Sequence, residues 1–280
     1  MGQWQLEFES VDYTYPGSDR PALQALTLRL PTSKRSALIG QNGCGKTTLF
    51  QLANGLYRPQ RGKIYYQGVP VRYDGRSLMQ LRQAVGLVFQ NPEQQVVAAT
   101  VEQDISYGLC NLGLPEPLIA ERVEQILIQF NLLDLATTPV QHLSLGQKKR
   151  VSLADVMVLQ PQLLLLDEPT AYLDHGHTRQ FMALLQSIHA AGTTILLATH
   201  DLDLVYRWAD WVFVMDQGRL VLEGTPQTVF AQQSQLTELR LEVPLVAEVL
   251  STLKQFQSPN PADGQVSIQQ LRERIVNTFF

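Results

Sequence analysis

A glycine-rich segment between an apolar run and a helical pattern holds the residues best suited to chemistry. The apolar run over 36–39 predicts a short buried strand, and residues 49–53 predict a helix. Between them, the pattern G-x-x-x-x-G-K-[ST] lets backbone N–H groups turn inward around a phosphate, at the positive end of that helix. We expect Lys46 to reach the terminal phosphates and the Thr47 hydroxyl to ligate Mg²⁺. The predicted nucleotide contacts in this segment are Gly40, Gln41, Asn42, Gly43, Cys44, Gly45, Lys46, Thr47 and Thr48.

Two acidic residues end a second apolar run, over 163–166, which predicts a buried parallel strand. Successive side chains of a strand point to opposite sides, so the two carboxylates can take different roles. We expect Asp167 to hold Mg²⁺ together with Thr47, and Glu168 to activate the attacking water as a general base. The alternative is an acidic pair that only ends a strand, and the Lys46 segment on a preceding strand–helix unit argues against it.

A second phosphate-binding candidate stands at the start of a predicted helix over 147–158. The N–H groups there and the hydroxyl of Ser144, close to Gly146, could hold a phosphate. The helix belongs to a predicted helical insert, so we expect it to lie too far from Lys46 to reach phosphates bound in the same chain. The basic residues 148–150 are expected to form a solvated helix face rather than a DNA contact.

Strands and helices alternate around these residues. Strand patterns cover residues 4–30, 62–66, 85–89 and 194–199, with a closing hairpin at 212–222. Helical patterns cover about 100–159 and 177–190. We therefore predict a domain over 1–235 into which a helical subdomain, at about 95–160, is inserted.

The C-terminal part differs from this alternation. Residues 236–256 predict a helix, turn-forming residues over 258–264 predict a linker, and a last helix is expected from 267. We predict that 236–280 forms a small helical domain.

An aromatic side chain just upstream of the glycine-rich segment could stack on adenine, because the flat face of that base accepts any π partner. Tyr15 is our first candidate for this contact and Tyr13 the second. Tyrosines on half-buried strands more often pack within the protein, and that alternative stays open.

The composition of the 280 residues limits the classes of function. With 45% hydrophobic and 17% charged residues, the chain is typical of a folded globular protein. A net charge of -4 argues against a nucleic-acid partner, which would need a basic excess. The two cysteines, Cys44 and Cys110, form no disulfide framework and fit a reducing compartment. We expect Cys44 to fill a slot in the loop rather than to act as an acidified thiol.

Together these motifs resemble the ATP-binding-cassette ATPases over residues 4–230. In that family the segment that holds Ser144, Gly146 and Gln147 is the signature motif, and the resemblance implies that it contacts the γ-phosphate bound to the opposing subunit. The resemblance implies three further roles. Gln90 would lie near Mg²⁺ and the attacking water, Asp174 would cross between subunits, and His200 would contact the γ-phosphate.

The same resemblance implies the fold class. We expect an α/β P-loop NTPase with a RecA-like core sheet, an antiparallel β subdomain and a helical signature subdomain, followed by the small C-terminal helical extension. One residue departs from the family pattern, because Leu145 stands where L-S-G-G-Q has its first glycine. Since Ser144 and Gly146 remain, we expect function to survive, with reduced turnover or an asymmetric dimer left open.

Residues 88–115 and 199–210 are similar to the ATPases of energy-coupling-factor importers, above all to those of cobalt/nickel transporters. This similarity implies an ATPase that binds ATP and Mg²⁺ and pairs with a second ATPase subunit, expected as a homodimer. It implies a peripheral position on the cytoplasmic face of the cell membrane, with a transmembrane coupling subunit and a substrate-binding membrane subunit as partners. A vitamin importer for biotin, riboflavin or folate is the alternative. A DNA-repair ATPase is more remote, because the sequence has no sustained heptads.

Overall fold

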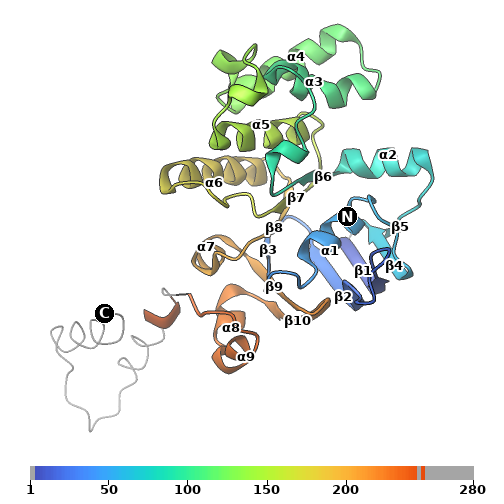
Figure 1. Cartoon of the computed structure of the whole chain (residues 1–280), viewed down its shortest axis with the longest axis vertical. Helices are drawn as coiled ribbons and strands as arrows, with labels where there is room; N and C mark the ends of the chain where they lie inside the picture. The colour runs from blue at the N-terminus through green and yellow to red at the C-terminus, as the bar shows by residue number, and fades with distance from the viewer. Residues whose placement is uncertain (1–3, 245–246, 250–280) are drawn as a thin grey trace, which may run out of the picture.

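Two β-sheets and a set of helices make up the described part of the chain, residues 4–244 and 247–249, in a computed structural model (Figure 1). The larger sheet has six strands in the order β10-β9-β3-β8-β7-β6. Its first five strands along the chain are parallel, and β10 closes the sheet antiparallel to β9. The strands are β3 (Arg35–Ile39), β6 (Val85–Val88), β7 (Leu163–Asp167), β8 (Thr194–Ala198), β9 (Trp211–Asp216) and β10 (Arg219–Gly224).

The strand order explains how distant sequence segments meet. Strand β8 pairs in parallel with β3 on one side and with β7 on the other. The carboxyl ends of three neighbouring parallel strands therefore lie along one edge, where ligands bind in open α/β sheets. The glycine-rich segment follows β3, Glu168 follows β7, and His200 stands two residues after β8.

The smaller sheet is antiparallel, with the order β2-β1-β4-β5. It consists of β1 (Trp4–Tyr13), β2 (Leu23–Pro31), β4 (Arg61–Tyr66) and β5 (Val69–Pro70). One hydrophobic cluster joins this sheet to the larger one around helix α1 (Lys46–Ala53), and it contains Phe8 of β1, Phe50 of α1 and Leu165 of β7. Phe50 is fully buried, which contributes about 1.5–3 kcal/mol and fixes α1 against the sheet.

A second cluster lies on the other side of β7. Leu163 and Leu165 belong to the first cluster, whereas Leu164 and Leu166 belong to the second, as the alternation of strand side chains requires. The second cluster packs the helical part of the molecule onto the sheet, and Figure 1 shows α3, α4 and α5 grouped beyond α6. These helices are α3 (Val101–Asn111), α4 (Glu116–Gln129), α5 (Leu145–Met157) and α6 (His175–Ala190).

The remaining helices are short or polar. Helix α2 (Gly75–Ala84) leads into β6, and three single-turn 3₁₀ segments, η1 (Pro92–Gln94), η2 (Leu133–Leu135) and η3 (Val140–His142), connect the helical part. Helices α7 (Leu202–Trp208), α8 (Pro226–Phe230) and α9 (Gln233–Glu238) cover the β9 side, where a third cluster includes Val205, Phe230 and Leu236. The expected combination of a parallel sheet, an antiparallel sheet and a helical insert is therefore present.

The continuous helix predicted over 236–256 is wrong in its first part. Helix α9 ends at Glu238, and residues 241–244 have no regular structure. Arg240 takes a left-handed conformation with φ 53°, and the N–H of Leu241 donates to the carbonyl of Leu236 at 2.9 Å. This is the bonding of a Schellman end. Residues 247–249 are helical, and the predicted linker and last helix lie outside the described residues.

This C-terminal segment contacts the glycine-rich segment directly. The side-chain amide of Gln41 donates to the carbonyl of Leu239 at 3.0 Å. Leu239, Leu241 and Val243 also pack against the third cluster. The chain after α9 is thus attached to the rest of the molecule over its described length.

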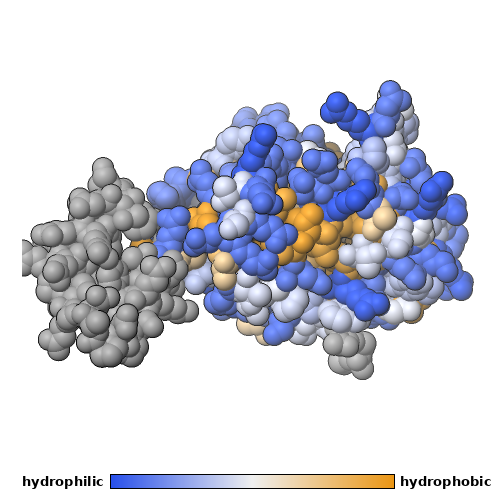
Figure 2. All heavy atoms as spheres, turned by 90° about the horizontal axis from the view of Figure 1, so that it is seen from below, coloured by the Kyte–Doolittle hydropathy of each residue, from blue (hydrophilic) through white to orange (hydrophobic). Residues whose placement is uncertain are grey.

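No helix within the described residues is long and apolar enough to cross a membrane. Figure 2 shows a face that is mostly hydrophilic, with hydrophobic residues along its middle.

Candidate active site

The glycine-rich segment forms a tight loop between β3 and α1, and its glycines are required by the backbone. Gly40 has φ 150° and Gly45 has φ 109°, in the region that side chains strain. A Cβ atom at Gly45 would lie 2.7 Å from the carbonyl oxygen of Ala22, and one at Gly40 would collide with the carbonyl of Met215. The loop is therefore held close to neighbouring backbone on both sides, and α1 begins directly after it.

Lys46 is the first residue of α1 and is only 7% exposed. Its ammonium donates to the carbonyl of Gly40 at 2.7 Å and to that of Gln41 at 3.2 Å. A buried ammonium needs such acceptors, because an unpaired one would be strongly destabilising. The loop carbonyls thus fix the Lys46 ammonium at the wall of a cavity. The cavity has a volume of about 810 Å³, within the size range of small-molecule sites.

The cavity collects most of the residues expected from the sequence. It is lined by Tyr15, Arg20, Pro21, Ala22, Asn42, Gly43, Gly45, Lys46, Thr47, Thr48, Gln90, Asp167, Glu168, Ala171, Tyr172 and His200. Gly40 and Gln41 line an adjacent groove instead. Cys44 is buried, and burial raises the pKa of its thiol, which fits a loop-filling side chain and not an acidified one.

Thr47 and Asp167 provide two oxygen ligands at one point of the cavity. The Thr47 hydroxyl donates to Oδ2 of Asp167 at 2.6 Å. Burial raises the pKa of Asp167, while the bond from Thr47 and the charge of Lys46 lower it. Gln90 adds an amide oxygen from the loop after β6. Hydroxyl, carboxylate and amide oxygens are the ligands that Mg²⁺ accepts beside phosphates and water, so this donor set fits that ion.

Glu168 and His200 meet across the ends of β7 and β8. Nδ1 of His200 lies 2.9 Å from Oε2 of Glu168, and because an ionised carboxylate only accepts, Nδ1 is the donor. The Glu168 side chain is 8% exposed, whereas the His200 ring is 71% exposed. Glu168 has φ 45°, an unusual conformation for a residue with a side chain, and its N–H donates to the carbonyl of Ala198 at 2.9 Å.

Tyr15 is the aromatic side chain that reaches the cavity. Its hydroxyl donates to Oε1 of Gln51 at 3.1 Å and bonds to Oγ1 of Thr48 at 2.9 Å. Its ring meets Tyr13 and Tyr57 edge-on, with centroid distances of 5.2 Å and 5.7 Å. Tyr13, the second candidate, is buried and stacked on Tyr57, so Tyr15 alone of the two is available to a base.

Four of the expected site residues lie elsewhere. Ser144 caps α5 in a capping box: its N–H donates to Oε1 of Gln147 at 2.8 Å, and the N–H of Gln147 donates to its hydroxyl at 3.3 Å. Asp174 caps α6 and bonds to His177. Among the described residues, the cavity lining does not include these two caps or the residues beside Ser144 that were expected with it, Gly146 and Gln147.

A family model described as ABC transporter matches residues 23–171. Over 279 residues, and 100% of both chains, the sequence is 63% identical to a putative ABC transporter ATP-binding protein of Nostoc sp.. The chain belongs to the ABC transporter ATP-binding family. The fold described above is accordingly the ABC ATPase fold expected from the sequence, and the activity of this family is ATP hydrolysis.

Two further similarities concern one branch of the family. This ABC ATPase is 38% identical over 272 residues to the energy-coupling factor transporter ATP-binding protein EcfA of Methanocaldococcus jannaschii, with 97% of each chain covered. It also superimposes on the structure of cbiO1 from Clostridium perfringens, part of the ABC transporter complex cbiONQ. The TM-score is 0.75 at 38% identity, over 89% of this chain and 99% of that chain.

Some cavity residues of the ABC ATPase were not predicted. Arg20, Pro21 and Ala22 come from the turn between β1 and β2, and Tyr172 lies in the loop after β7 with φ 65° and 84% exposure. Tyr172 lies two residues before the predicted site residue Asp174, and this was the available signal for it. The turn residues follow only from the packing of the two sheets, so no local pattern announces them.

Proposed function

We propose that this ABC ATPase is the ATP-hydrolysing subunit of an energy-coupling-factor importer for cobalt or nickel ions, and that two copies dimerise around two ATP. The observation that carries the proposal is the division of the site. The loop, the acidic pair and His200 share one cavity, while the capped start of α5 lies outside it in the same chain. A phosphate held by both must therefore lie between two chains.

The start of α5 is well suited to this role. Ser144, Leu145 and Gln141–His142 nearby are exposed, so a second chain can approach the helix start. The N–H groups of the first turn and the positive helix end favour an anion there. The capping box holds Ser144 and Gln147 in a fixed arrangement before any partner arrives, which reduces the ordering required on binding.

Within one cavity each side chain has a distinct task. Lys46 exchanges its loop carbonyls for the terminal phosphates of ATP, and Tyr15 offers its ring to the adenine. Thr47, Asp167 and Gln90 would hold Mg²⁺, which when bound neutralises charge on the transferring phosphoryl group. Glu168 accepts the proton of the water that attacks the γ-phosphorus, and ADP departs as the leaving group. His200 keeps that carboxylate oriented while its exposed ring faces the γ-phosphate.

The names of two relatives support the transport role. One is an energy-coupling factor ATP-binding protein, and the other is part of an ABC transporter complex of the cbiONQ type. We infer that this chain lies peripherally on the cytoplasmic face of the membrane. Its membrane partners would be a transmembrane coupling subunit and a substrate-binding subunit.

Replacing Glu168 tests the catalytic part of the proposal. We expect E168Q to bind ATP normally, to lose more than 99% of hydrolysis, about a 100-fold effect, and to accumulate as an ATP-bound dimer. Light scattering with ATP and with ADP measures the dimer. E121Q, an exposed substitution on α4, is the control. Hydrolysis by E168Q at the wild-type rate, or a protein that stays monomeric with ATP, would refute it.

Uptake measurements test the cargo. The membrane complex that co-purifies with the tagged chain is placed in vesicles and supplied with radioactive cobalt, nickel or vitamins. We expect metal uptake that requires ATP and disappears in the E168Q complex. Uptake of a vitamin instead would reject the metal cargo and retain the energy-coupling-factor role.

A further inference from the structure

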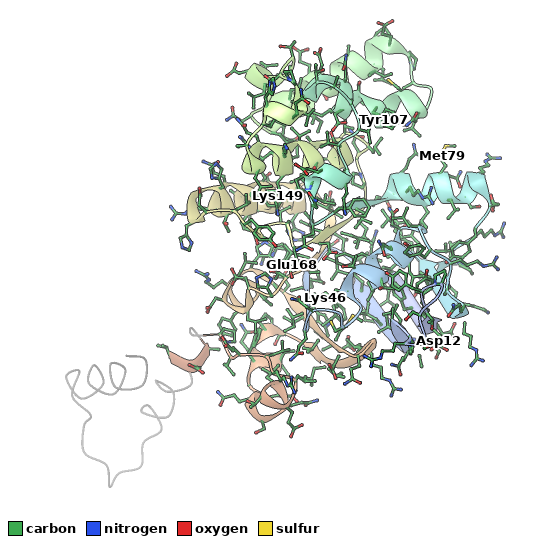
Figure 3. The ribbon with its side chains drawn as sticks, viewed as in Figure 1. Asp12, Lys46, Met79, Tyr107, Lys149 and Glu168 are labelled. Carbon is green, nitrogen blue, oxygen red and sulfur yellow. The ribbon has the colours of Figure 1, made fainter. Side chains whose placement is uncertain are left out.

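The basic cluster at the start of α5 is not the uniformly solvated face that its sequence predicted. Lys148 pairs with Glu93 on the surface at 3.0 Å, and Arg150 is partly exposed. Lys149, between them, is only 4% exposed. Adjacent residues of a helix face different directions, so one lysine of the cluster points into the protein while its neighbours do not. Figure 3 shows Lys149 above Glu168, near the middle of the molecule.

The ammonium of Lys149 is directed at the backbone that carries the predicted general base. It donates to the carbonyl of Glu168 at 3.2 Å and to the carbonyl of Pro169 at 2.8 Å. Burial lowers the pKa of Lys149 to about 8, while the charge of Glu168 opposes that effect. Burying an ammonium costs desolvation free energy, which is offset only when hydrogen-bond acceptors are fixed close to the charge. The two adjacent carbonyls of Glu168 and Pro169 are such acceptors.

Glu168 has a backbone that requires such support. With φ 45° it occupies a sparsely populated conformation, which persists only when the surrounding structure determines it. Its N–H is held by Ala198 of β8 and its carbonyl by Lys149 of α5. The side chain is then free to bond with His200 inside the cavity.

A second contact joins the same helix to the same loop. The ring of His177 lies against Gly146, where a Cβ atom would stand 2.9 Å from Cδ2, and Nδ1 of that ring lies 2.8 Å from Oδ2 of Asp174. The start of α5 therefore contacts the segment after β7 at two places. Lys149 bonds near the beginning of that segment, at Glu168, and Gly146 packs near its end, beside Asp174.

We propose that Lys149 is a positioning residue for Glu168, because it fixes the backbone of Glu168 and Pro169. Lys149 thereby links two parts of one chain: the start of α5, which would bind the nucleotide of the partner chain, and the general base Glu168. The inference rests on the proposed function for the role of Glu168. It goes beyond that function by assigning the orientation of the carboxylate to a lysine that touches no nucleotide.

The test compares K149M, which keeps the length but removes the donors, with K149R, which restores donors and charge, and with K148M as the matched surface control. We expect K149M to lower kcat at least 10-fold while the Kd for ATP changes less than threefold, because a small misplacement of a catalytic group affects the reacting geometry and not binding. K149R should recover most of kcat, and K148M should equal the wild type. Thermal unfolding monitors the fold.

The pH profile supplies a readout that does not depend on K149M folding. The two proteins differ at this one side chain, so a difference between the profiles of the wild type and K149R isolates Lys149. We expect wild-type kcat to fall as the pH rises through about 8, where Lys149 loses its charge, and K149R to keep its activity there.

Three results would overturn the inference: wild-type kcat in K149M, K149R no more active than K149M, or superimposable pH profiles. Dimer formation separates it from the proposed function. We expect E168Q with K149M to form the ATP-bound dimer, and loss of that dimer would show a general structural role for Lys149. If E168Q alone forms no dimer, the proposed function fails, whereas the comparison of K149M and K149R still reports on Lys149.

Discussion

His200 and Glu168 are joined by a hydrogen bond of 2.9 Å although they follow different strands, β8 and β7. The carboxylate is nearly buried and the ring is largely exposed. The pair thus connects the inside of the cavity with the surface that a second chain would cover. His200 can therefore hold the carboxylate of Glu168 in place and also contact a group that lies outside the cavity.

Replacing His200 should therefore affect catalysis more than binding. We expect H200A to lower kcat about 100-fold, because the carboxylate loses its orienting donor, while the Kd for ATP changes less than threefold. Steady-state hydrolysis and a binding titration measure the two quantities. H189A on α6, whose ring bonds only to the backbone at Thr193, is the control. Equal activity of H200A and the wild type would contradict this role.

The paired oxygens of Thr47 and Asp167 predict a specific dependence on Mg²⁺. With D167N the carboxylate charge is lost while its shape and its bond with Thr47 can persist. We expect the Mg²⁺ concentration for half-maximal hydrolysis to rise about 10-fold or more, because a neutral amide is a weaker ligand for a hard cation. A titration of Mg²⁺ at saturating ATP measures it. D201N, a helix cap of α7 beside the cavity, should leave the midpoint unchanged.

The position of Tyr15 predicts that its ring matters more than its hydroxyl. Stacking of a base on an aromatic side chain contributes about 1–3 kcal/mol, which corresponds to about 5- to 150-fold in Kd. We expect Y15A to weaken ATP binding within this range and Y15F, which keeps the ring but loses the bonds to Thr48 and Gln51, to change it less than threefold. Discrimination between ATP and inorganic triphosphate should fall in Y15A only. Equal losses in both variants would assign the effect to the hydroxyl.

A buried acid in the helical part predicts how stability depends on pH. Burial raises the pKa of Asp155 on α5 well above its usual value, and the neighbouring carboxylate of Asp104 on α3 raises it further. The folded protein therefore holds a proton that the unfolded chain releases near pH 4, so this group's stabilising contribution is present below about pH 4 and is lost as the pH rises toward the raised pKa.

The uncharged variant D155N should remove this loss. Its amide can donate to Asp104, whose Oδ1 already accepts the N–H groups of Val97 and Ala98 at 2.9 Å and 2.8 Å. We expect the melting temperature of D155N to exceed that of the wild type by an amount that grows as the pH rises above about 4 toward the raised pKa of Asp155. Parallel melting curves for the two proteins across that range would disprove the assignment.

The parts of the structure that the sequence predicted are those with a local signal. Period-two alternation marked β1, continuous apolar runs marked β7 and β8, and the glycine spacing marked the loop before α1. The rule for parallel strands accounts for the neighbouring placement of these loops once the strand order is known.

The missed parts have no such signal or a misleading one. Helix α2 was not predicted: it is mostly polar and buries only Leu81, although Asp74 caps its start. The end of α9 depends on a left-handed Arg240, a conformation that glycine usually announces. Lys149 sits in a basic triplet that suggested solvent on all sides, and only its tertiary partners show that it turns inward.

The hydrogen bond from Gln41 to the carbonyl of Leu239 has a practical consequence. A chain shortened just after α8 would leave the Gln41 amide without this acceptor and would remove Leu236, a fully buried member of the third cluster. Removing the residues after α8 would therefore make the glycine-rich loop less constrained, because Gln41 belongs to that loop. A lower nucleotide affinity of the shortened protein would then reflect the loss of the bond between Gln41 and Leu239, and not only the loss of interactions made by the removed residues.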